Sequence, residues 1–462
     1  MNRRLNRRAL FLFAADIAVI SGAIVIALYL RLGADGLWFQ LSENLGWLRV
    51  AIVTVVCLTS LYFFDLYDFS VMNDRRELKA RLVQALGGGW IFLAAIFYAF
   101  PFSEIGRGTE LYSMGISLVM LVGLRTSIHF LLGHPGIGEK ILIVGDADLV
   151  VDTAKAAFDR RDYGLRIAGY ITNDFSKIEG RVPEVKYLGS IERLEEIVDQ
   201  EHIDSIVIGV RERRGAIPAT TLLRLRLAGR VSIEECSSFF ERVTGRVHLD
   251  SLHPSGLIYS DHSHRTQLAF YSRDVFYRTL ALIGLIVSLP AALLVAVLII
   301  LESEGGFFYK QERVGKNGSI FQLIKFRSMK VDAEADGKPV WAVDGDSRTT
   351  FVGRIIRKIR LDEVPQFWNI VKGEMNFIGP RPERPHFVSK LSEEVPYYEL
   401  RHLIAPGLTG WAQIKYPYGA SVDDARNKLQ YDLYYIKNRN LLLDVKIMFE
   451  TVKTILFGRG AR

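Results

Sequence analysis

A chain of 462 residues is long enough for two or three domains, and 49% of its residues are hydrophobic and concentrated in blocks, which indicates a membrane protein with soluble parts. The net charge of +7 favours acidic partners such as phosphates, nucleotides or anionic lipid. The two cysteines, Cys57 and Cys236, lie far apart, which excludes a disulfide framework and a cysteine-based metal site.

Four apolar segments in residues 1–135 predict a bundle of four transmembrane helices, because each is long enough to cross a bilayer. They comprise residues 9–30, 47–64, 85–102 and 111–132. Three consecutive glycines in the third segment favour close packing against another helix. Cations precede the first segment and separate the second from the third, so we expect the N-terminus and everything after residue 132 to be cytosolic.

Asp16 interrupts the first apolar segment. An ionisable residue inside a membrane is a candidate functional residue. It also lies near the expected cytosolic end of its helix, where Arg7 or Arg8 could reach it. We therefore favour a structural ion pair with one of these arginines, and a functional role is the alternative.

Residues 136–245 alternate between strand and helix patterns, which predicts a Rossmann-like α/β domain with a parallel, doubly wound sheet. The predicted strands are 140–145, 165–171, 204–210 and 230–233, and the predicted helices are 149–160, 191–200 and 222–229. The first turn, residues 145–148, has one glycine of the dinucleotide fingerprint, and its two aspartates would repel a pyrophosphate. We therefore interpret the domain as a scaffold or regulatory domain, with a bound dinucleotide as the alternative.

Residues 246–272 are interpreted as a polar linker from the middle domain to the membrane. The segment holds four histidines, His248, His253, His262 and His264. A metal site is the alternative interpretation, although the spacing matches no zinc pattern and no cysteine joins the cluster.

A fifth apolar segment, residues 279–301, is long enough to span the membrane, but its flanking charges argue against a simple crossing. Cations lie on both sides of it, which places both of its ends in the cytosol. Ser288 and Pro290 lie near its middle, where proline bends a helix. We therefore predict a re-entrant helix hairpin that enters one leaflet and returns.

Basic and aromatic residues are interleaved in residues 306–330. Such a pattern can bind nucleic acid, but beside a membrane hairpin it favours contact with headgroups and phosphate, so no nucleic-acid partner is expected. Asp344 and Asp346 form the Asp-x-Asp pattern of many nucleotide-sugar glycosyltransferases, and an ordinary turn is the alternative.

A stretch late in the chain joins acidic and basic residues in the combination that phosphate chemistry requires. Asp362 and Glu363 follow a basic run directly, and Arg381 lies between Pro380 and Pro382. A carboxylate can attack phosphorus or hold a hard cation, while arginine binds phosphate oxygens. The alternative for the acidic pair alone is a solvated helix face. Weaker candidates for phosphate contacts are three further cations, Lys325, Arg327 and Arg360.

The sequence resembles the bacterial sugar transferases known as monotopic phosphoglycosyl transferases or polyprenyl glycosylphosphotransferases. Four motifs carry the resemblance, QERVGKNGSIFQLIKFRSM (311–329), LDEVPQFWN (361–369), GEMNFIGPRP (373–382) and APGLTGWAQI (405–414). The match implies a C-terminal α/β-type monotopic catalytic domain over residues 273–462, with the same re-entrant hairpin. The whole chain resembles the large form of the family, which acts in exopolysaccharide initiation.

The resemblance implies that Asp362 attacks the phosphorus bearing the sugar of a UDP-sugar, expels UMP, and forms an aspartyl phosphosugar that polyprenyl phosphate displaces. Glu363 matches the acid that holds Mg²⁺, and Arg381 matches the residue that engages the nucleotide. An ordinary aspartate, with a pKa of about 3.9, is ionised at neutral pH without a general base. The implied location is the bilayer of the bacterial inner membrane, with the middle and catalytic domains in the cytosol, and a homo-oligomer is left open.

Three other functions stay open at this point. A direct-displacement glycosyltransferase using Asp344 and Asp346 would release UDP rather than UMP. A nucleotide-sugar dehydratase or epimerase would need an intact glycine loop and a Tyr-x-x-x-Lys pair, neither of which the sequence contains. A non-enzymatic membrane scaffold for polysaccharide assembly would not depend on Asp362.

Overall fold

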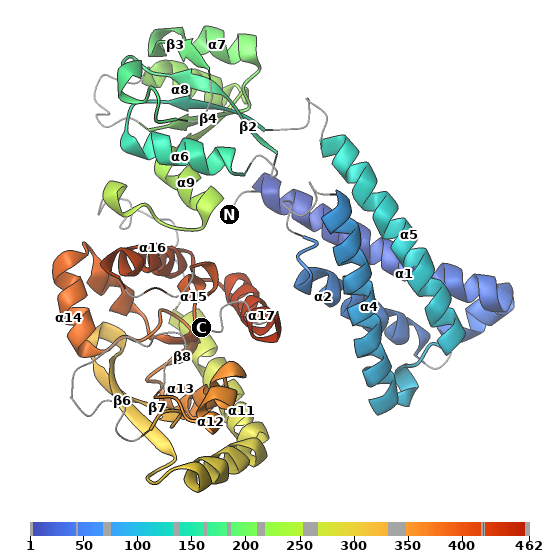
Figure 1. Ribbon diagram of the computed structural model, residues 1–462. Coiled ribbons are helices and arrows are strands. Elements are labelled where there is room, and N and C mark those ends of the chain that lie inside the picture. The colour runs from blue at the N-terminus through green and yellow to red at the C-terminus, as the bar shows by residue number, and fades with distance from the viewer. Residues whose placement is uncertain are drawn as a thin grey trace. The chain divides into compact units, whose positions relative to one another are not determined.

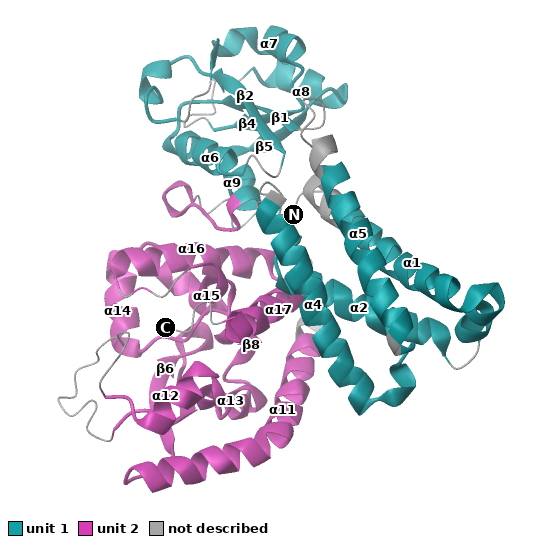
Figure 2. Ribbon diagram, turned by 45° about the vertical axis from the view of Figure 1, so that its right-hand side comes forward, with its two compact units in different colours: residues 1–243 teal, residues 244–462 magenta. Residues whose placement is uncertain are grey.

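The computed structural model describes residues 3–42, 45–67, 75–132, 139–160, 164–182, 186–209, 218–252, 267–330, 348–416, 419 and 421–457. The chain divides into two compact units, Met1–Val243 and Thr244–Arg462 (Figure 2). Each unit is described by itself below.

In the described residues, the first unit begins with four long helices, as the apolar segments predict. They are α1 (Arg3–Ser42), α2 (Gly46–Phe63), α4 (Arg75–Ala99) and α5 (Arg107–Leu132) (Figure 1). Each includes an apolar stretch long enough to cross a membrane. Helix α1 continues past the predicted segment and changes direction at Gly33, whose φ of 70° suits a residue without a side chain. Apolar side chains from all four helices form one buried cluster.

The glycines of α4 allow it to approach α2 closely, as predicted. A Cβ atom on Gly89 would lie 3.3 Å from the Cβ atom of Ser60, and one on Gly88 would lie 3.4 Å from the ring of Phe64. The hydroxyl of Ser60 donates a hydrogen bond to the carbonyl of Ala85 at 2.5 Å. Small residues therefore hold these two helices together by backbone proximity.

Asp16 forms a buried ion pair, but its partner is not the one we expected. Nη2 of Arg125, on α5, lies 2.7 Å from Oδ2 of Asp16, and both side chains are fully buried. The expected partners were Arg7 and Arg8, whose side chains lie outside the described residues; the described partner is Arg125. A charge in an apolar environment is tolerated when it is paired, so this pair fixes α1 against α5 and supports the structural interpretation of Asp16.

The rest of the first unit is a five-stranded sheet of parallel strands in the order β3-β2-β1-β4-β5. Its elements are β1 (Glu139–Val144), α6 (Asp148–Phe158), β2 (Leu165–Ile171), β3 (Tyr187–Gly189), α7 (Leu194–Glu201), β4 (Ser205–Ile208), α8 (Ala219–Leu227), β5 (Ser232–Glu235) and α9 (Cys236–Thr244). Side chains of α6 and α9 cover one face of the sheet, and those of α7 and α8 cover the other. The sheet is therefore wound on both faces, as the strand–helix alternation predicts.

The carboxylates of the first turn in this sheet are paired within the domain. Nζ of Lys177 lies 2.7 Å from Oδ2 of Asp146, and Nη2 of Arg181 lies 2.9 Å from Oδ1 of Asp148. Both carboxylates of this turn therefore have cationic partners within the domain. The scaffold or regulatory interpretation of the domain stays a prediction.

The second unit combines one long apolar helix with short helices and two small sheets. Its elements are α11 (Gln267–Glu302), β6 (Phe308–Val314), β7 (Ile320–Phe326), α12 (Phe351–Lys358), α13 (Gln366–Lys372), β8 (Asn376–Ile378), α14 (Pro385–Glu394), β9 (Gly407–Thr409), α15 (Trp411–Lys415), α16 (Val422–Asn438) and α17 (Leu441–Phe457). Strands β6 and β7 form an antiparallel hairpin, while β8 and β9 pair in parallel.

The N-terminal part of the second unit, residues 244–252, is called the anchor segment here. Nε1 of Trp411 donates to the carbonyl of Gly245 at 2.8 Å, and the amide of Val247 donates to the carbonyl of Gln430 at 3.0 Å. Val247 and Leu249 are buried in a cluster with side chains of α14 and α16. The predicted linker therefore begins with residues that pack into the second unit.

The proposed histidine cluster is largely outside the described residues, because His253, His262 and His264 are among those left out. Within the described parts of the chain, no three side chains of metal-binding type come together.

Candidate active site

Asp362 and Glu363, called the acidic pair, lie on a tight turn between α12 and α13. The turn is a short 3-10 helix, Leu361–Glu363, entered through Arg360 in the left-handed conformation, with φ 60°. Leu361 and Val364, on either side of the pair, pack into a cluster with Val295 and Ile299 of α11 and with Phe326 and Ile356. The acidic pair is therefore held directly against the C-terminal half of the long apolar helix.

Both carboxylates are buried rather than solvated. Asp362 is 8% exposed and Glu363 is 9% exposed, so the alternative of a solvated helix face is wrong. The Oδ1 atom of Asp362 is buried without a hydrogen-bond partner among the residues that the structure describes. An unsatisfied buried carboxylate oxygen is costly in free energy unless something binds it, so the geometry favours a site that is completed by a ligand.

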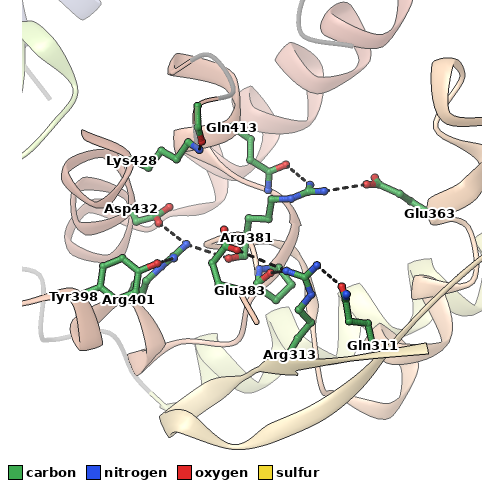
Figure 3. A network of polar contacts seen from close by, with 12 residues as sticks. Gln311, Arg313, Glu363, Arg381, Glu383, Tyr398, Arg401, Gln413, Lys428 and Asp432 are labelled. Carbon is green, nitrogen blue, oxygen red and sulfur yellow. Dashed lines mark hydrogen bonds and ion pairs between the residues drawn. The ribbon is translucent and has the colours of Figure 1, made fainter. Parts of the chain in front are cut away.

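Three cations converge on one oxygen of Glu363. Its Oε1 atom lies 3.7 Å from Nζ of Lys325, 3.4 Å from Nη1 of Arg360 and 3.6 Å from Nη2 of Arg381. These residues come from β7, from the turn before the acidic pair and from the loop after β8. Figure 3 shows the Arg381 guanidinium directed toward Glu363. More positive charge than one carboxylate can neutralise suits the binding of phosphates.

The two carboxylates are electrostatically different. Burial, followed by the neighbouring charge of Glu363, raises the pKa of Asp362 above the ordinary aspartate range. Burial would also raise the pKa of Glu363, but Lys325, Arg381 and Arg360 outweigh it and hold that pKa below its usual value. The ordinary aspartate pKa used in the sequence analysis is therefore too low for Asp362, because packing had not been considered. Neighbouring carboxylates with pKa values pushed apart are typical of catalytic sites.

The acidic pair lies within the part of the chain that matches a known protein family. The family model described as "Bacterial sugar transferase" matches residues 269–458. A Bacillus subtilis protein provisionally named an undecaprenyl-phosphate N-acetylgalactosaminyl 1-phosphate transferase is 51% identical over 121 residues, which are 26% of this chain and 67% of that protein.

The chain belongs to the bacterial sugar transferase family.

Two longer relatives extend the similarity of this transferase beyond its second unit. The UDP-N-acetylgalactosamine-undecaprenyl-phosphate N-acetylgalactosaminephosphotransferase of Aeromonas hydrophila is 44% identical over 52% of this chain and 56% of its own length. The undecaprenyl-phosphate glucose phosphotransferase of Komagataeibacter xylinus is 29% identical over 96% of this chain and 79% of its own length. The transferase thus spans just over half of the first relative and most of the second.

The backbone carbonyls of the two prolines that flank Arg381 both accept hydrogen bonds. The Pro380 carbonyl accepts a hydrogen bond from the amide of Gly407 at 2.9 Å, and the Pro382 carbonyl accepts one from Nη1 of Arg313 at 2.9 Å. Two rigid rings with both carbonyls engaged leave the backbone of Arg381 little freedom. The prolines are thus placed to orient Arg381.

Arg327 is not part of the cation cluster on Glu363. Its Nη1 donates to the carbonyl of Glu304 at 2.8 Å, and its Nη2 donates to the carbonyl of Ser303 at 3.0 Å. Arg327 therefore binds the chain just after α11 and connects it to the end of β7. We expected Arg327 to contact phosphate. Its side-chain nitrogens instead donate to backbone carbonyls, which indicates a structural role.

Several residues that support the site were missed by the sequence analysis. Asn369, fully buried on α13, donates to the Gln322 carbonyl at 2.8 Å and accepts from the Ile324 amide at 3.1 Å, which joins α13 to β7 beside Lys325. Gln413 accepts a hydrogen bond from Nη1 of Arg381 at 3.3 Å. Both lie inside the motifs that carry the resemblance, and their position there was the available signal.

His402, beside Arg401, gives the second unit a predicted sensitivity to acid. Burial and then the charge of Arg401 lower the pKa of His402 to about 4, against about 6.5 in an unfolded chain. Between these values the unfolded state binds more protons, so stability falls as the pH falls, by at most about 3 kcal/mol. In His402→Gln we expect a smaller decrease in melting temperature between about pH 7 and about pH 5 than in the wild type. An equal decrease in both proteins would contradict the assignment.

Proposed function

We propose that this transferase moves a sugar 1-phosphate from a UDP-sugar to polyprenyl phosphate, and that it releases UMP through a covalent intermediate on Asp362. The observation that carries the proposal is the buried acidic pair, ringed by cations and packed against an apolar helix. The names of the relatives support the acceptor, because each relative is named for transfer to undecaprenyl phosphate. The reaction is the first membrane step in the synthesis of an exopolysaccharide or a related glycan.

In the first half-reaction, a carboxylate oxygen of Asp362 attacks the phosphorus that bears the sugar. A phosphorus–oxygen bond forms to Asp362, and the bond from the same phosphorus to the UMP oxygen breaks. UMP leaves with that electron pair, and Asp362 carries a phosphosugar. The unpartnered Oδ1 atom of Asp362 supports this role, because it needs no other hydrogen bond to be broken first.

In the second half-reaction, a phosphate oxygen of the polyprenyl phosphate attacks the same phosphorus. The bond to Asp362 breaks, its electron pair returns to the carboxylate, and the product is a polyprenyl diphosphate sugar. Lys325, Arg360 and Arg381 face the negative charge that both steps gather around phosphorus. Arg381 binds the nucleotide phosphates.

Mg²⁺ fits the donor set of the site. Magnesium usually keeps several waters and binds through one or two carboxylates together with substrate phosphates, rather than in a cage of protein ligands. Glu363, next to Asp362 and facing the proposed phosphate site, would hold the metal through its carboxylate. When bound there, the ion supplies charge neutralisation for the phosphates and lowers their mutual repulsion.

The long helix α11 supports a re-entrant arrangement of residues 279–301. Near its start, Nε of Arg273 lies 3.0 Å from Oδ2 of Asp444, and at its end Glu302 accepts a hydrogen bond from the Val352 amide at 3.0 Å. Both ends of α11 thus contact the same unit, and the helix bends within its length (Figure 2). Pro290 lies inside the helix, and Ser288 donates to the Leu285 carbonyl at 3.2 Å; both features favour a bend in a helix.

The exposed middle of α11 supports insertion into one leaflet. Ile286, Val287 and Leu293 are 64%, 74% and 60% exposed, which is unfavourable in water and favourable in lipid. An insertion that returns to its own side leaves the acidic pair at the bilayer surface, where a soluble nucleotide-sugar and a lipid acceptor can meet. The proposed location is the cytosolic face of the bacterial inner membrane.

The nucleotide product tests the proposal against its rivals. The full-length protein in lipid nanodiscs would be given polyprenyl phosphate and, in turn, UDP-linked N-acetylgalactosamine, glucose and galactose. We expect UMP with at least one donor. Release of UDP would instead favour direct displacement by Asp344 and Asp346, which lie outside the described residues, and release of neither nucleotide would favour a scaffold.

A further inference from the structure

Arg401 occupies the centre of a buried polar network behind Arg381. It lies in the turn Tyr398–Leu403, and it is 6% exposed. Its Nη1 donates to the hydroxyl of Tyr398 at 2.5 Å, and its Nη2 lies 3.0 Å from Oδ2 of Asp432 on α16. The same Nη2 donates to the backbone carbonyl of Arg381 at 3.0 Å. Figure 3 shows Arg401 between Asp432 and the backbone of Arg381.

Burying this ion pair costs desolvation free energy, so the pair adds little net stability to the fold. Asp432 is 2% exposed, so both charges are removed from water. The desolvation of two ions commonly cancels their attraction, and apolar side chains of similar size are often at least as stabilising. A buried pair is therefore better explained by the geometry that it enforces than by the stability that it adds.

The geometry that it enforces is that of Arg381. Pro380 and Pro382 restrict the backbone on either side, and Arg401 holds the carbonyl between them. The side chain then extends to Gln413 at 3.3 Å and to Glu363 at 3.6 Å. Restricting the backbone limits the positions that the guanidinium can reach, and small errors in the position of a charged group are costly in catalysis.

We propose that Arg401, held by Asp432 and Tyr398, is a positioning residue that fixes Arg381 in the orientation in which it meets the phosphates of the nucleotide-sugar. Arg401 does not touch the substrate; it acts through the backbone of Arg381. The inference rests on the proposed function, because it takes the nucleotide-sugar as the ligand of Arg381.

The substitution Arg401→Lys tests the positioning role of Arg401 most directly. Lysine keeps the charge that Asp432 requires, but a single ammonium cannot reproduce the planar fork that reaches Tyr398, Asp432 and the Arg381 carbonyl together. We expect the KM for the UDP-sugar to rise about tenfold, with a smaller change in kcat and an unchanged KM for polyprenyl phosphate. The affinity for UMP, measured by calorimetry, should fall by a similar factor.

Arg273→Lys is a matched control, because Arg273 makes the same kinds of contact elsewhere in the unit. Its Nη2 donates to the hydroxyl of Tyr435 at 2.6 Å, and its Nε lies 3.0 Å from Oδ2 of the buried Asp444. Loss of a buried arginine network should lower the melting temperature of both variants, but only Arg401→Lys should weaken the binding of UMP. Equal effects of both variants on UMP binding would show a merely structural role and overturn the inference.

A double-mutant cycle separates action through Arg381 from a direct contact. In an Arg381→Ala background, Arg401→Lys should change the KM for the UDP-sugar by less than about twofold, because its target is gone. A full tenfold effect in that background would overturn the inference while leaving the proposed function intact. If the wild type neither binds UMP nor releases it, the proposed function fails, and the inference fails with it.

Discussion

Replacing Asp362 with asparagine is expected to reduce turnover by roughly 10⁴-fold or more, which is the scale seen when a catalytic nucleophile is removed. The amide has nearly the shape of the carboxylate, but it has no anionic oxygen to bond to phosphorus. Insertion into the membrane should be unchanged, because the apolar neighbours Leu361 and Val364 hold the turn. The measurement is UMP release by purified protein, together with capture of labelled phosphosugar on the protein after it is mixed with labelled UDP-sugar.

Asp423→Asn is the matched control for this prediction. The residue lies on α16 and is exposed, so the same chemical change should leave turnover and labelling unaltered. Appreciable turnover by purified Asp362→Asn would rule out Asp362 as the nucleophile. Normal polysaccharide production by cells carrying only that variant would favour the scaffold.

Replacing Glu363 with glutamine is expected to lower kcat/KM by about 10²–10³-fold and to raise the Mg²⁺ concentration needed for half-maximal activity at least about tenfold. The variant loses the one carboxylate on which Lys325, Arg360 and Arg381 converge. These cations would then repel one another, and the Mg²⁺ that we propose for this site would lose its protein ligand. A titration of activity against Mg²⁺ measures the second effect separately from the first.

Glu393→Gln provides the control for Glu363→Gln, because Glu393 is an exposed residue of α14. Its metal titration should coincide with that of the wild type. If Glu363→Gln also gave the wild-type titration curve, Glu363 would not be the metal ligand, and its role would be limited to ordering the cations.

Features that extend over many consecutive residues, such as long apolar blocks, were the most predictable from the sequence. The long apolar blocks gave the membrane-type helices, and the apolar run at 165–171 coincides with β2. Strand β3, Tyr187–Gly189, was not predicted, because three residues are too few to show the alternating pattern of a strand. Strand β5, Ser232–Glu235, begins two residues later than the predicted strand at 230–233. Pairing in a parallel sheet decides such short strands, and the pairing depends on residues far away in the sequence.

The acidic pair could be found from sequence because its residue types and the surrounding motifs are local. Its electrostatics could not, because the raised pKa of Asp362 depends on burial by α11 and β7. Arg327 shows the converse, since a cation in the right motif proved to bind backbone carbonyls. Likewise, Arg125 is separated from Asp16 by more than a hundred positions, so the residues near Asp16 in the sequence did not indicate this partner.

The anchor segment affects how the C-terminal half could be isolated for biochemistry. A fragment cut at residue 269, where the family model begins, would lack Val247 and Leu249 and leave a hollow lined by Leu429, Leu433 and Tyr398. Each missing side chain removes about 2 kcal/mol of burial, and water would enter beside α16, which carries Asp432. A cut that keeps this packing intact lies ahead of Thr244, so the boundary of the enzyme unit is earlier than the start of the family model at residue 269.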